Sequence, residues 1–142
     1  MNVLILGARG MLGQALVRAY ASEDVTAWDR GDLDITNEDA VAEHVHFLEP
    51  DLVVNAAAYT DVEAAEEKFE EADAVNGYAV GNLAVACAEA DTPLVHVSTD
   101  YVFEGASGGG YGEDDEPLHP VNAYGRSKLL GETLLRENGK NY

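Results

Sequence analysis

Short apolar runs alternate along this chain with longer stretches in which apolar residues recur at helical spacing. The short runs are brief, rich in Val, Ile and Leu, and bounded by polar or turn residues, which is typical of β-strands. They cover residues 3–6, 25–28, 52–54 and 94–97. The stretches between them have the period of amphipathic helices. They cover residues 11–20, 36–48, 63–72 and 75–90. This alternation predicts an α/β fold built on a parallel sheet.

Three glycines directly follow the first apolar run. Gly7, Gly10 and Gly13 have the spacing Gly-x-x-Gly-x-x-Gly and lead into the first helical stretch. In such a turn glycine lets the backbone approach a pyrophosphate lying on the helix N-terminus. An ordinary glycine-rich turn is the alternative, because the commoner spacing is Gly-x-Gly-x-x-Gly. We predict a Rossmann-like doubly wound parallel sheet with strand order 3-2-1-4, flanked by helices, in one domain over residues 1–142.

Asp29 closes the second predicted strand, 22 residues after Gly7. That is the place of the carboxylate that binds the adenosine ribose in dinucleotide-binding units. Arg30 follows at once and could pair with a 2′-phosphate. The sequence therefore leaves the choice between NAD and NADP open. A polar residue that merely closes a strand is an equally good interpretation of Asp29.

Tyr124 and Lys128 lie four residues apart on the last helical stretch. Residues at this spacing share one helix face, so a phenol and an ammonium can address the same ligand. A nearby cation favours the phenolate, which would let the tyrosine transfer a proton near neutral pH. Thr99 follows the fourth strand and could hold a substrate oxygen beside them. For the tyrosine and lysine taken alone, an ordinary amphipathic surface is the alternative.

Other residues that could carry chemistry have simpler interpretations. Cys87 and His96 lie inside apolar runs, and we predict both to be packed in the core. Residues 104–120 are rich in glycine and acid and are predicted to form a loop, which could be a lid over Thr99 and Tyr124. Its adjacent carboxylates have no metal-ligand spacing, so no metal site is predicted.

Acidic residues outnumber basic ones by 27 to 8, which gives a formal net charge of −19. Binding to nucleic acid needs a basic footprint, so we exclude it. Salt would screen the self-repulsion, and we expect a halophilic protein, with a merely acidic one as the alternative. The chain has no long apolar run and no basic region followed by an apolar one at its start. We therefore expect neither a membrane span nor a signal peptide, and a cytoplasmic protein.

Several segments together resemble one known family. They are Asn55–Thr60, Val75-Asn76, Ser98–Phe103, Asn122–Lys128 and Gly131-Glu132. They are similar to the extended short-chain dehydrogenases, and within these to the dTDP-4-dehydrorhamnose reductase family. The resemblance implies NAD(P)H-dependent reduction of the C4 keto group of a dTDP-sugar, with NADPH or NADH as cofactor.

The resemblance also implies roles for individual residues. Thr99, Tyr124 and Lys128 would be the catalytic residues, and Tyr124 would donate the proton. Thr99 and Asp100 would contact the sugar. The cofactor would be lined by Gly7, Arg9, Gly10, Met11, Leu12, Gly13, Asp29, Asp34, Ile35, Ala56, Ala57, Ala58, Val97, Tyr124 and Lys128.

The chain departs from the family at two places. It ends at Tyr142, where family members continue into further strands and a substrate domain, so a homodimer or a second chain could complete the fold. Ala15 stands where the family can carry a glutamate linked to a magnesium-bridged dimer, so that metal site is not predicted here. An epimerase or dehydratase relative, or a regulatory module that binds a dinucleotide without turnover, remains an alternative.

Overall fold

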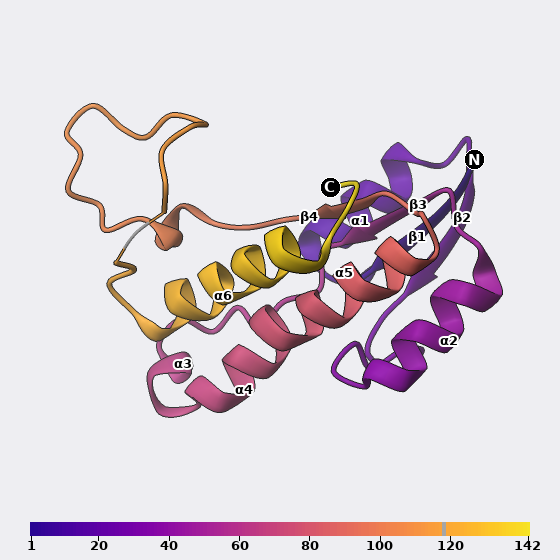
Figure 1. The fold of residues 1–142 in the computed structure, drawn as a ribbon, viewed down its shortest axis with the longest axis horizontal. Helices are drawn as coiled ribbons and strands as arrows, with labels where there is room; N and C mark the ends of the chain where they lie inside the picture. The colour runs from indigo at the N-terminus through magenta and orange to yellow at the C-terminus, as the bar shows by residue number, and fades with distance from the viewer. Residues whose placement is uncertain (118) are drawn as a thin grey trace.

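The computed structural model describes residues 1–117 and 119–142 and is built on a four-stranded parallel sheet (Figure 1). The strands are β1 (Asn2–Leu6), β2 (Asp24–Trp28), β3 (Leu52–Asn55) and β4 (Leu94–His96). All three neighbouring pairs run parallel, which confirms the α/β class and the Rossmann-like sheet. The carboxyl ends of the strands therefore meet at one edge of the sheet, where a ligand site is expected.

The predicted strand order 3-2-1-4 is wrong, because the sheet has the order β2-β1-β3-β4. Leu4 of β1 pairs with Thr26 on one side and with Val53 on the other. The physical reason is burial: β1 and β3 are almost entirely buried, whereas β2 is partly exposed along its length. A nearly continuous apolar strand belongs inside a parallel sheet, and the more polar β2 belongs at its edge.

Alternate residues of β1 face two different layers of helices. Val3 and Ile5 pack against Leu16 and Val17 of α1 (Met11–Ala19). Leu4 and Leu6 lie in a larger cluster with residues of α2 (Glu38–Leu48) and α5 (Ala79–Glu89). The sheet is thus covered on both faces, as predicted for a doubly wound fold. Cys87 is buried in the larger cluster, and burial raises its pKa to about 12, which confirms its place in the core.

Some helix boundaries differ from the predicted ones. The N-cap of α2 is Asn37, whose side chain accepts a hydrogen bond from the backbone of Ala40, and the helix follows it. The predicted helix 63–72 is broken at Lys68 into α3 (Ala64–Glu67) and α4 (Phe69–Asp73). The next one opens with a π-helical turn, η1 (Ala74–Tyr78), before α5 begins.

Helix α6 (Ala123–Asn138) packs beside α5 and η1 (Figure 1). Glycines allow this close approach: a Cβ at Gly131 would lie 2.1 Å from the carbonyl oxygen of Asn76, and one at Gly77 would lie 2.5 Å from Leu130. The predicted loop 104–120 has no helix or strand at 104–117 or 119–120, and Leu118 lies outside the described residues. None of the helices formed by the described residues is long and apolar enough to cross a membrane.

Candidate cofactor and proton-transfer site

A pocket of about 640 Å³ opens at the carboxyl edge of the sheet, between the start of α1 and the start of α6. It brings together most of the predicted site residues. Those that line it are Gly7, Gly10, Met11, Leu12, Asp29, Asp34, Ile35, Ala56, Ala57, Ala58, Val97, Tyr124 and Lys128. The remaining four, Arg9, Gly13, Thr99 and Asp100, do not line it. The glycine turn and the tyrosine–lysine pair therefore share one cavity.

The three glycines of the turn have three different structural tasks. Gly7 has φ +75 and a Cβ there would meet the backbone of Ala57, so this turn admits no side chain. A Cβ at Gly13 would lie 2.1 Å from the carbonyl oxygen of Gly7, so Gly13 lets α1 pack on the turn. At Gly10 the nearest atom would be that same oxygen, at 3.3 Å. Gly10 therefore leaves open the side that faces the pocket.

The start of α1 is suited to an anion. Its N-cap is Gly10, no side chain caps the helix, and no acidic residue lies in its first turn. The free N–H groups and the positive end of the helix dipole are then available to a phosphate. Met11 and Leu12, which are 92% and 42% exposed, place apolar surface at the pocket mouth. These residues fit a dinucleotide.

Asp29 connects the end of β2 to the glycine turn. One carboxylate oxygen accepts the backbone N–H of Arg9 at 3.0 Å, and the other accepts that of Arg30 at 2.8 Å. These two hydrogen bonds, with that of Arg30 first, lower the pKa of the Asp29 carboxyl group. Each oxygen keeps a further lone pair, so Asp29 can both hold the turn and accept a hydrogen bond from a ligand hydroxyl.

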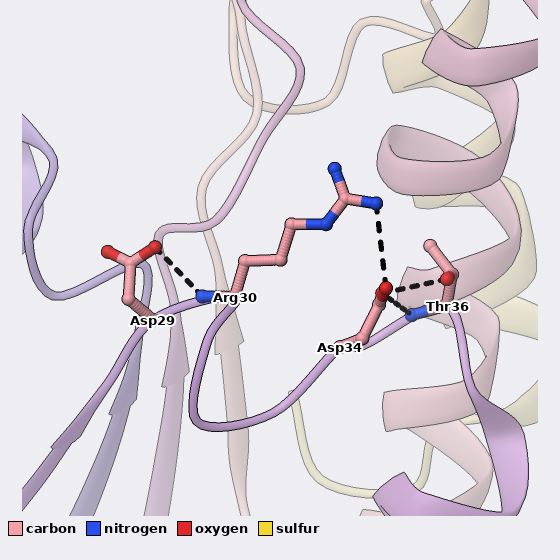
Figure 2. Close-up of polar contacts among 4 residues, drawn as sticks. All are labelled: Asp29, Arg30, Asp34 and Thr36. Atoms are coloured by element: carbon pink, nitrogen blue, oxygen red, sulfur yellow. Dashed lines mark hydrogen bonds and ion pairs between the residues drawn. The ribbon is translucent and has the colours of Figure 1, made fainter.

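The side chain of Arg30 extends away from Asp29 toward Asp34, as Figure 2 shows. Its guanidinium lies 3.6 Å from the Asp34 carboxylate and is largely exposed. The hydroxyl and the backbone N–H of Thr36 donate to Asp34 at 2.7 and 3.1 Å, and the hydroxyl bond is the main cause of a lowered pKa of Asp34. Asp34 therefore shapes this wall of the pocket and holds the arginine beside it.

The other end of the pocket is formed by the start of α6. Asn122 caps the helix by accepting the N–H of Gly125 at 2.7 Å, and Glu66 of α3 accepts the N–H of Ala123 at 2.6 Å. A Cβ at Gly125 would lie 2.2 Å from the carbonyl oxygen of Tyr101. Glycine at that position therefore lets the 3-10 turn η2 (Asp100–Val102) approach the helix, and the ring of Tyr101 packs edge-on against Tyr124 at 5.7 Å.

Lys128 is almost fully buried, at 2% exposure. Its Nζ donates to the carbonyl oxygen of Val97 at 2.6 Å and lies 3.1 Å from Nε2 of His96. Burial lowers the pKa of Lys128 to about 8, although the charge of Glu132 acts in the opposite direction. A lysine that titrates this close to neutral pH is suited to proton transfer.

His96 is packed in the sheet as predicted, but it is also hydrogen-bonded. Burial, and then the charge of Lys128, lower its pKa to about 3, so the imidazole is neutral. Its second ring nitrogen, Nδ1, lies 3.1 Å from the side-chain nitrogen of Asn55. The strand pattern alone could not show that His96 lies between an asparagine on β3 and a lysine on α6.

Thr99 and Asp100 lie outside the pocket, at the start of η2. The Thr99 hydroxyl caps this turn by accepting the N–H of Tyr101 at 3.3 Å, and it donates to Asp100 at 3.3 Å. Asp100 is exposed. Asp100 lies on η2, which contacts α6, and Thr99 is the N-cap of that turn.

Sequence reasoning missed several pocket residues, because they are ordinary apolar or hydroxyl residues in loops and at element ends. They are Leu6, Leu33, Thr36, Tyr59, Thr60, Val75 and Ser98. It also missed the support for α6. Asn76 is buried in η1 and bonds the backbone of Tyr59 twice and the hydroxyl of Ser127 once. A π-turn of this kind often marks a functional site, but no sequence pattern announces it.

A glycine turn at the carboxyl edge of a parallel sheet shares one pocket with a buried lysine and with a tyrosine one helical turn before it, in a Rossmann-like fold. A family model described as the RmlD substrate binding domain matches residues 1–142. The chain belongs to this family.

Individual relatives agree with the family match. The probable low-salt glycan biosynthesis reductase Agl14 of Haloferax volcanii is 43% identical over 96% of the chain, and the dTDP-4-dehydrorhamnose reductase of Burkholderia thailandensis is 46% identical over 98%. The crystal structure of a dTDP-4-dehydrorhamnose reductase from Bacillus anthracis in complex with NADP superposes with a TM-score of 0.95 at 38% identity, over 99% of this chain. The chain spans about half the length of these proteins, 49%, 47% and 50% respectively.

Proposed function

We propose that this chain is the cofactor-binding and proton-donating part of an NAD(P)H-dependent reductase that acts on the C4 keto group of dTDP-4-dehydrorhamnose. One observation carries the proposal: Tyr124 and Lys128 line the same pocket as the glycine turn at the start of α1. The names of the related proteins, and the NADP bound to the Bacillus anthracis enzyme, support the substrate and the cofactor.

In this proposal the residues at the α1 end bind the cofactor, and those at the α6 end transfer the proton and contact the sugar. The turn from Gly7 to Gly13 holds the pyrophosphate, and Ala56–Ala58 allow a flat ring or a ribose to lie over the end of β3. Bound NAD(P)H supplies a hydride to the substrate carbon. Tyr124 gives its phenolic proton to the carbonyl oxygen, Lys128 supports Tyr124 and binds the nicotinamide ribose, and Thr99 and Asp100 contact the sugar.

The contacts around Asp29 favour use of both cofactors. The Asp29 carboxylate can accept from the ribose diol of NADH, and this would disfavour a 2′-phosphate. Arg30 lies at the same corner with its guanidinium exposed, and among the described residues Asp34 is its ion-pair partner, so it can turn toward a 2′-phosphate of NADPH. Arg30→Ala is expected to weaken NADPH binding while NADH binding changes little.

Substrate capture needs more than the described pocket. The related proteins are about twice as long, and we propose that a further domain, supplied by the rest of a longer chain or by a second chain, binds the nucleotide of the sugar. Without it much of the energy that positions the sugar is absent, and positioning can account for roughly 7–11 kcal/mol of a barrier.

The test is reductase activity of the chain joined to the C-terminal half of the Burkholderia thailandensis enzyme, assayed with dTDP-4-dehydrorhamnose and NADPH. Tyr124→Phe is expected to lower kcat by about 10²–10⁴-fold with cofactor affinity nearly unchanged, because only the proton donor is lost. Tyr78→Phe, on an exposed residue outside the pocket, is the control. An unchanged rate in Tyr124→Phe, or a folded fusion that binds NADPH and reduces no keto sugar, would contradict the proposal.

We also propose that the protein is adapted to high salt, which the net charge of −19 supports. Only five ion pairs occur among the described residues, and in each at least one partner is substantially exposed, so most of the negative charge is uncompensated. Salt near 1 M shortens the screening length to about 3 Å. The midpoint of urea unfolding is expected to rise as KCl increases from roughly 0.05 M, where charges are weakly screened, to roughly 2 M, where they are strongly screened. A flat midpoint would contradict salt adaptation.

A further inference from the structure

A row of hydrogen-bonded polar groups, buried at both ends and partly buried at His96, runs from the central sheet to α6. It starts at Asn55 at the end of β3, passes through the ring of His96 on β4 and ends at Nζ of Lys128. Asn55 is completely buried and Lys128 nearly so. In such surroundings each hydrogen bond has to be matched donor to acceptor, because an unmatched buried group costs roughly 1–3 kcal/mol.

The orientation of the Asn55 amide is fixed by its neighbour in the chain. The backbone N–H of Ala57 lies 3.0 Å from Oδ1 of Asn55 and can only donate. The atom that it meets must therefore be the amide oxygen, and the amide nitrogen must face His96. Asn55 thus presents an N–H donor to Nδ1 of the imidazole, at 3.1 Å.

This donor decides where the proton of His96 lies. Nδ1 has to accept from Asn55, so the neutral ring carries its proton on Nε2. Nε2 in turn faces Nζ of Lys128, at 3.1 Å. An ammonium has no lone pair and cannot accept from Nε2–H, whereas an amine can. The amine form of Lys128 accepts from His96 and donates to the Val97 carbonyl at 2.6 Å, so each of these two contacts joins one donor to one acceptor.

The ammonium form meets a conflict in the same geometry. It needs Nε2 of His96 as an acceptor, which moves the imidazole proton to Nδ1, directly opposite the N–H of Asn55. One contact then has two donors. Protonation of Lys128 is therefore opposed by a donor–donor mismatch at the contact between Asn55 and His96. The cost of burying the charge opposes it as well.

We propose that Asn55 and His96 form a positioning pair that holds the imidazole as its Nε2–H tautomer and so favours the amine form of Lys128. The pair is not in contact with the reacting atoms and acts only through Lys128. This inference rests on the proposed function for its purpose: the charge of Lys128 governs how readily Tyr124 gives up and regains its proton.

Two other titratable groups lie near Lys128 on α6. Glu132, one turn later on α6, favours the ammonium. Its carboxylate is itself bonded to the Ser98 hydroxyl and to Arg136, which share its charge. Tyr124, one turn earlier, lines the same pocket. Among the described residues of the sheet, His96 is the one whose contact with Nζ of Lys128 disfavours the ammonium form.

The first test is the ¹⁵N spectrum of the imidazole in the 142-residue chain, recorded without cofactor. At a pH near 10, above the pKa of Lys128, the account predicts a protonated Nε2 and an unprotonated Nδ1 on His96. His44 and His46 on α2 serve as internal references, assigned by substitution. A protonated Nδ1 on His96 at that pH would overturn the proposal.

The second test uses Asn55→Asp, which replaces the amide nitrogen that faces His96 with an oxygen. The donor at that contact becomes an acceptor, while the other oxygen still accepts the N–H of Ala57. The His96 proton is expected to move to Nδ1 and the Lys128 protonation constant, followed by ¹³Cε shift, to rise at least tenfold. The negative charge of the new aspartate by itself also raises the protonation constant of Lys128. The same substitution is therefore made in the His96→Phe background, where the charge still acts on Lys128 but the imidazole no longer links the two residues. The rise must be larger with His96 present.

Equal rises in the two backgrounds would show that charge alone acts and would overturn the tautomer account. If Asn55→Asp does not fold, the ¹⁵N spectrum of the unsubstituted chain still decides the question. None of these measurements uses cofactor or substrate. A failure of the proposed reductase function therefore appears in the activity assay and leaves the spectrum unchanged, so the two failures are distinguishable.

Discussion

The two ends of the pocket are built in different ways. At the α1 end the walls are main chain: a positive φ at Gly7 and backbone contacts within 3 Å of where side chains at Gly7 and Gly13 would lie. At the α6 end the walls are held by buried polar side chains. Asn76 joins η1 to Ser127 of α6, and Asn55 and His96 lead from the sheet to Lys128.

This difference has consequences for what a mutation does. A side chain added at the α1 end collides with backbone, so the damage is steric and local. A side chain shortened at the α6 end leaves donors and acceptors unmatched in several elements at once. The α6 end shares the steric limit, because a Cβ at Gly125 would lie 2.2 Å from the carbonyl oxygen of Tyr101. It is in addition sensitive to the loss of a polar side chain.

The largest expected effect is at Gly13. In Gly13→Ala the new Cβ would lie 2.1 Å from the carbonyl oxygen of Gly7, so α1 has to move off β1. We expect a loss of more than about 4 kcal/mol in the free energy of unfolding, measured by urea denaturation. Gly31→Ala is the matched control, since none of the described residues comes within 4 Å of a Cβ at Gly31. A Gly13→Ala protein as stable as the control would show that the turn is not held by backbone packing.

A smaller loss is expected at the α6 end from Asn76→Ala. This change leaves the backbone N–H and C=O of Tyr59 and the hydroxyl of Ser127 without their partner. We expect a loss on the order of 3 kcal/mol by the same denaturation experiment. Asn82→Ala, which removes one bond to the carbonyl of Ile35, should cost about 1 kcal/mol. Equal losses in the two variants would argue against a special role for η1.

The sequence predicted the α1 end better than the α6 end, and the reason is physical. The turn from Gly7 to Gly13 is shaped by backbone conformations that only glycine adopts, and these leave a local pattern in the chain. The contacts of Lys128 join β3, β4 and α6, which are distant in sequence, so no local pattern announces them. The four-residue spacing of Tyr124 and Lys128 predicted that they share one helix face, but it did not predict which residues surround them.

The strand order shows the same limit. Helix and strand periods predicted the four strands, but which strand lies beside β1 depends on burial. The exposed Asp24 and half-buried Thr26 in β2, set against the buried Val53 and Val54 in β3, would have pointed to the correct order. The second predicted helix was placed at Thr36 because Asp39 follows three residues later, as in a capping box, whereas the bond from the backbone N–H of Ala40 selects Asn37 as the N-cap of α2.

A third prediction concerns the dependence of stability on pH at the α6 end. Lys128 has a pKa of about 8 in the folded protein, below the ordinary value of 10.5. Between these values the unfolded chain binds more protons, so the free energy of unfolding rises with pH. Relative to Lys128→Met, the unsubstituted protein should gain about 3 kcal/mol from pH 8 to 10.5 and stay at its lower relative stability below pH 8. Parallel pH profiles would mean that Lys128 is not held at a lowered pKa.

Binding of a dinucleotide at the α1 end is the central claim, and calorimetric titration of the folded chain with NADPH and NADH in molar KCl tests it most directly. We expect binding of at least one of them, and its loss in Gly10→Val, because Gly10 leaves the pocket side of the turn open and a side chain there would block the pyrophosphate. Gly31→Val, outside the pocket, should bind normally. Absence of heat and of any thermal shift with both cofactors, on a sample that circular dichroism shows to be folded, would contradict the account.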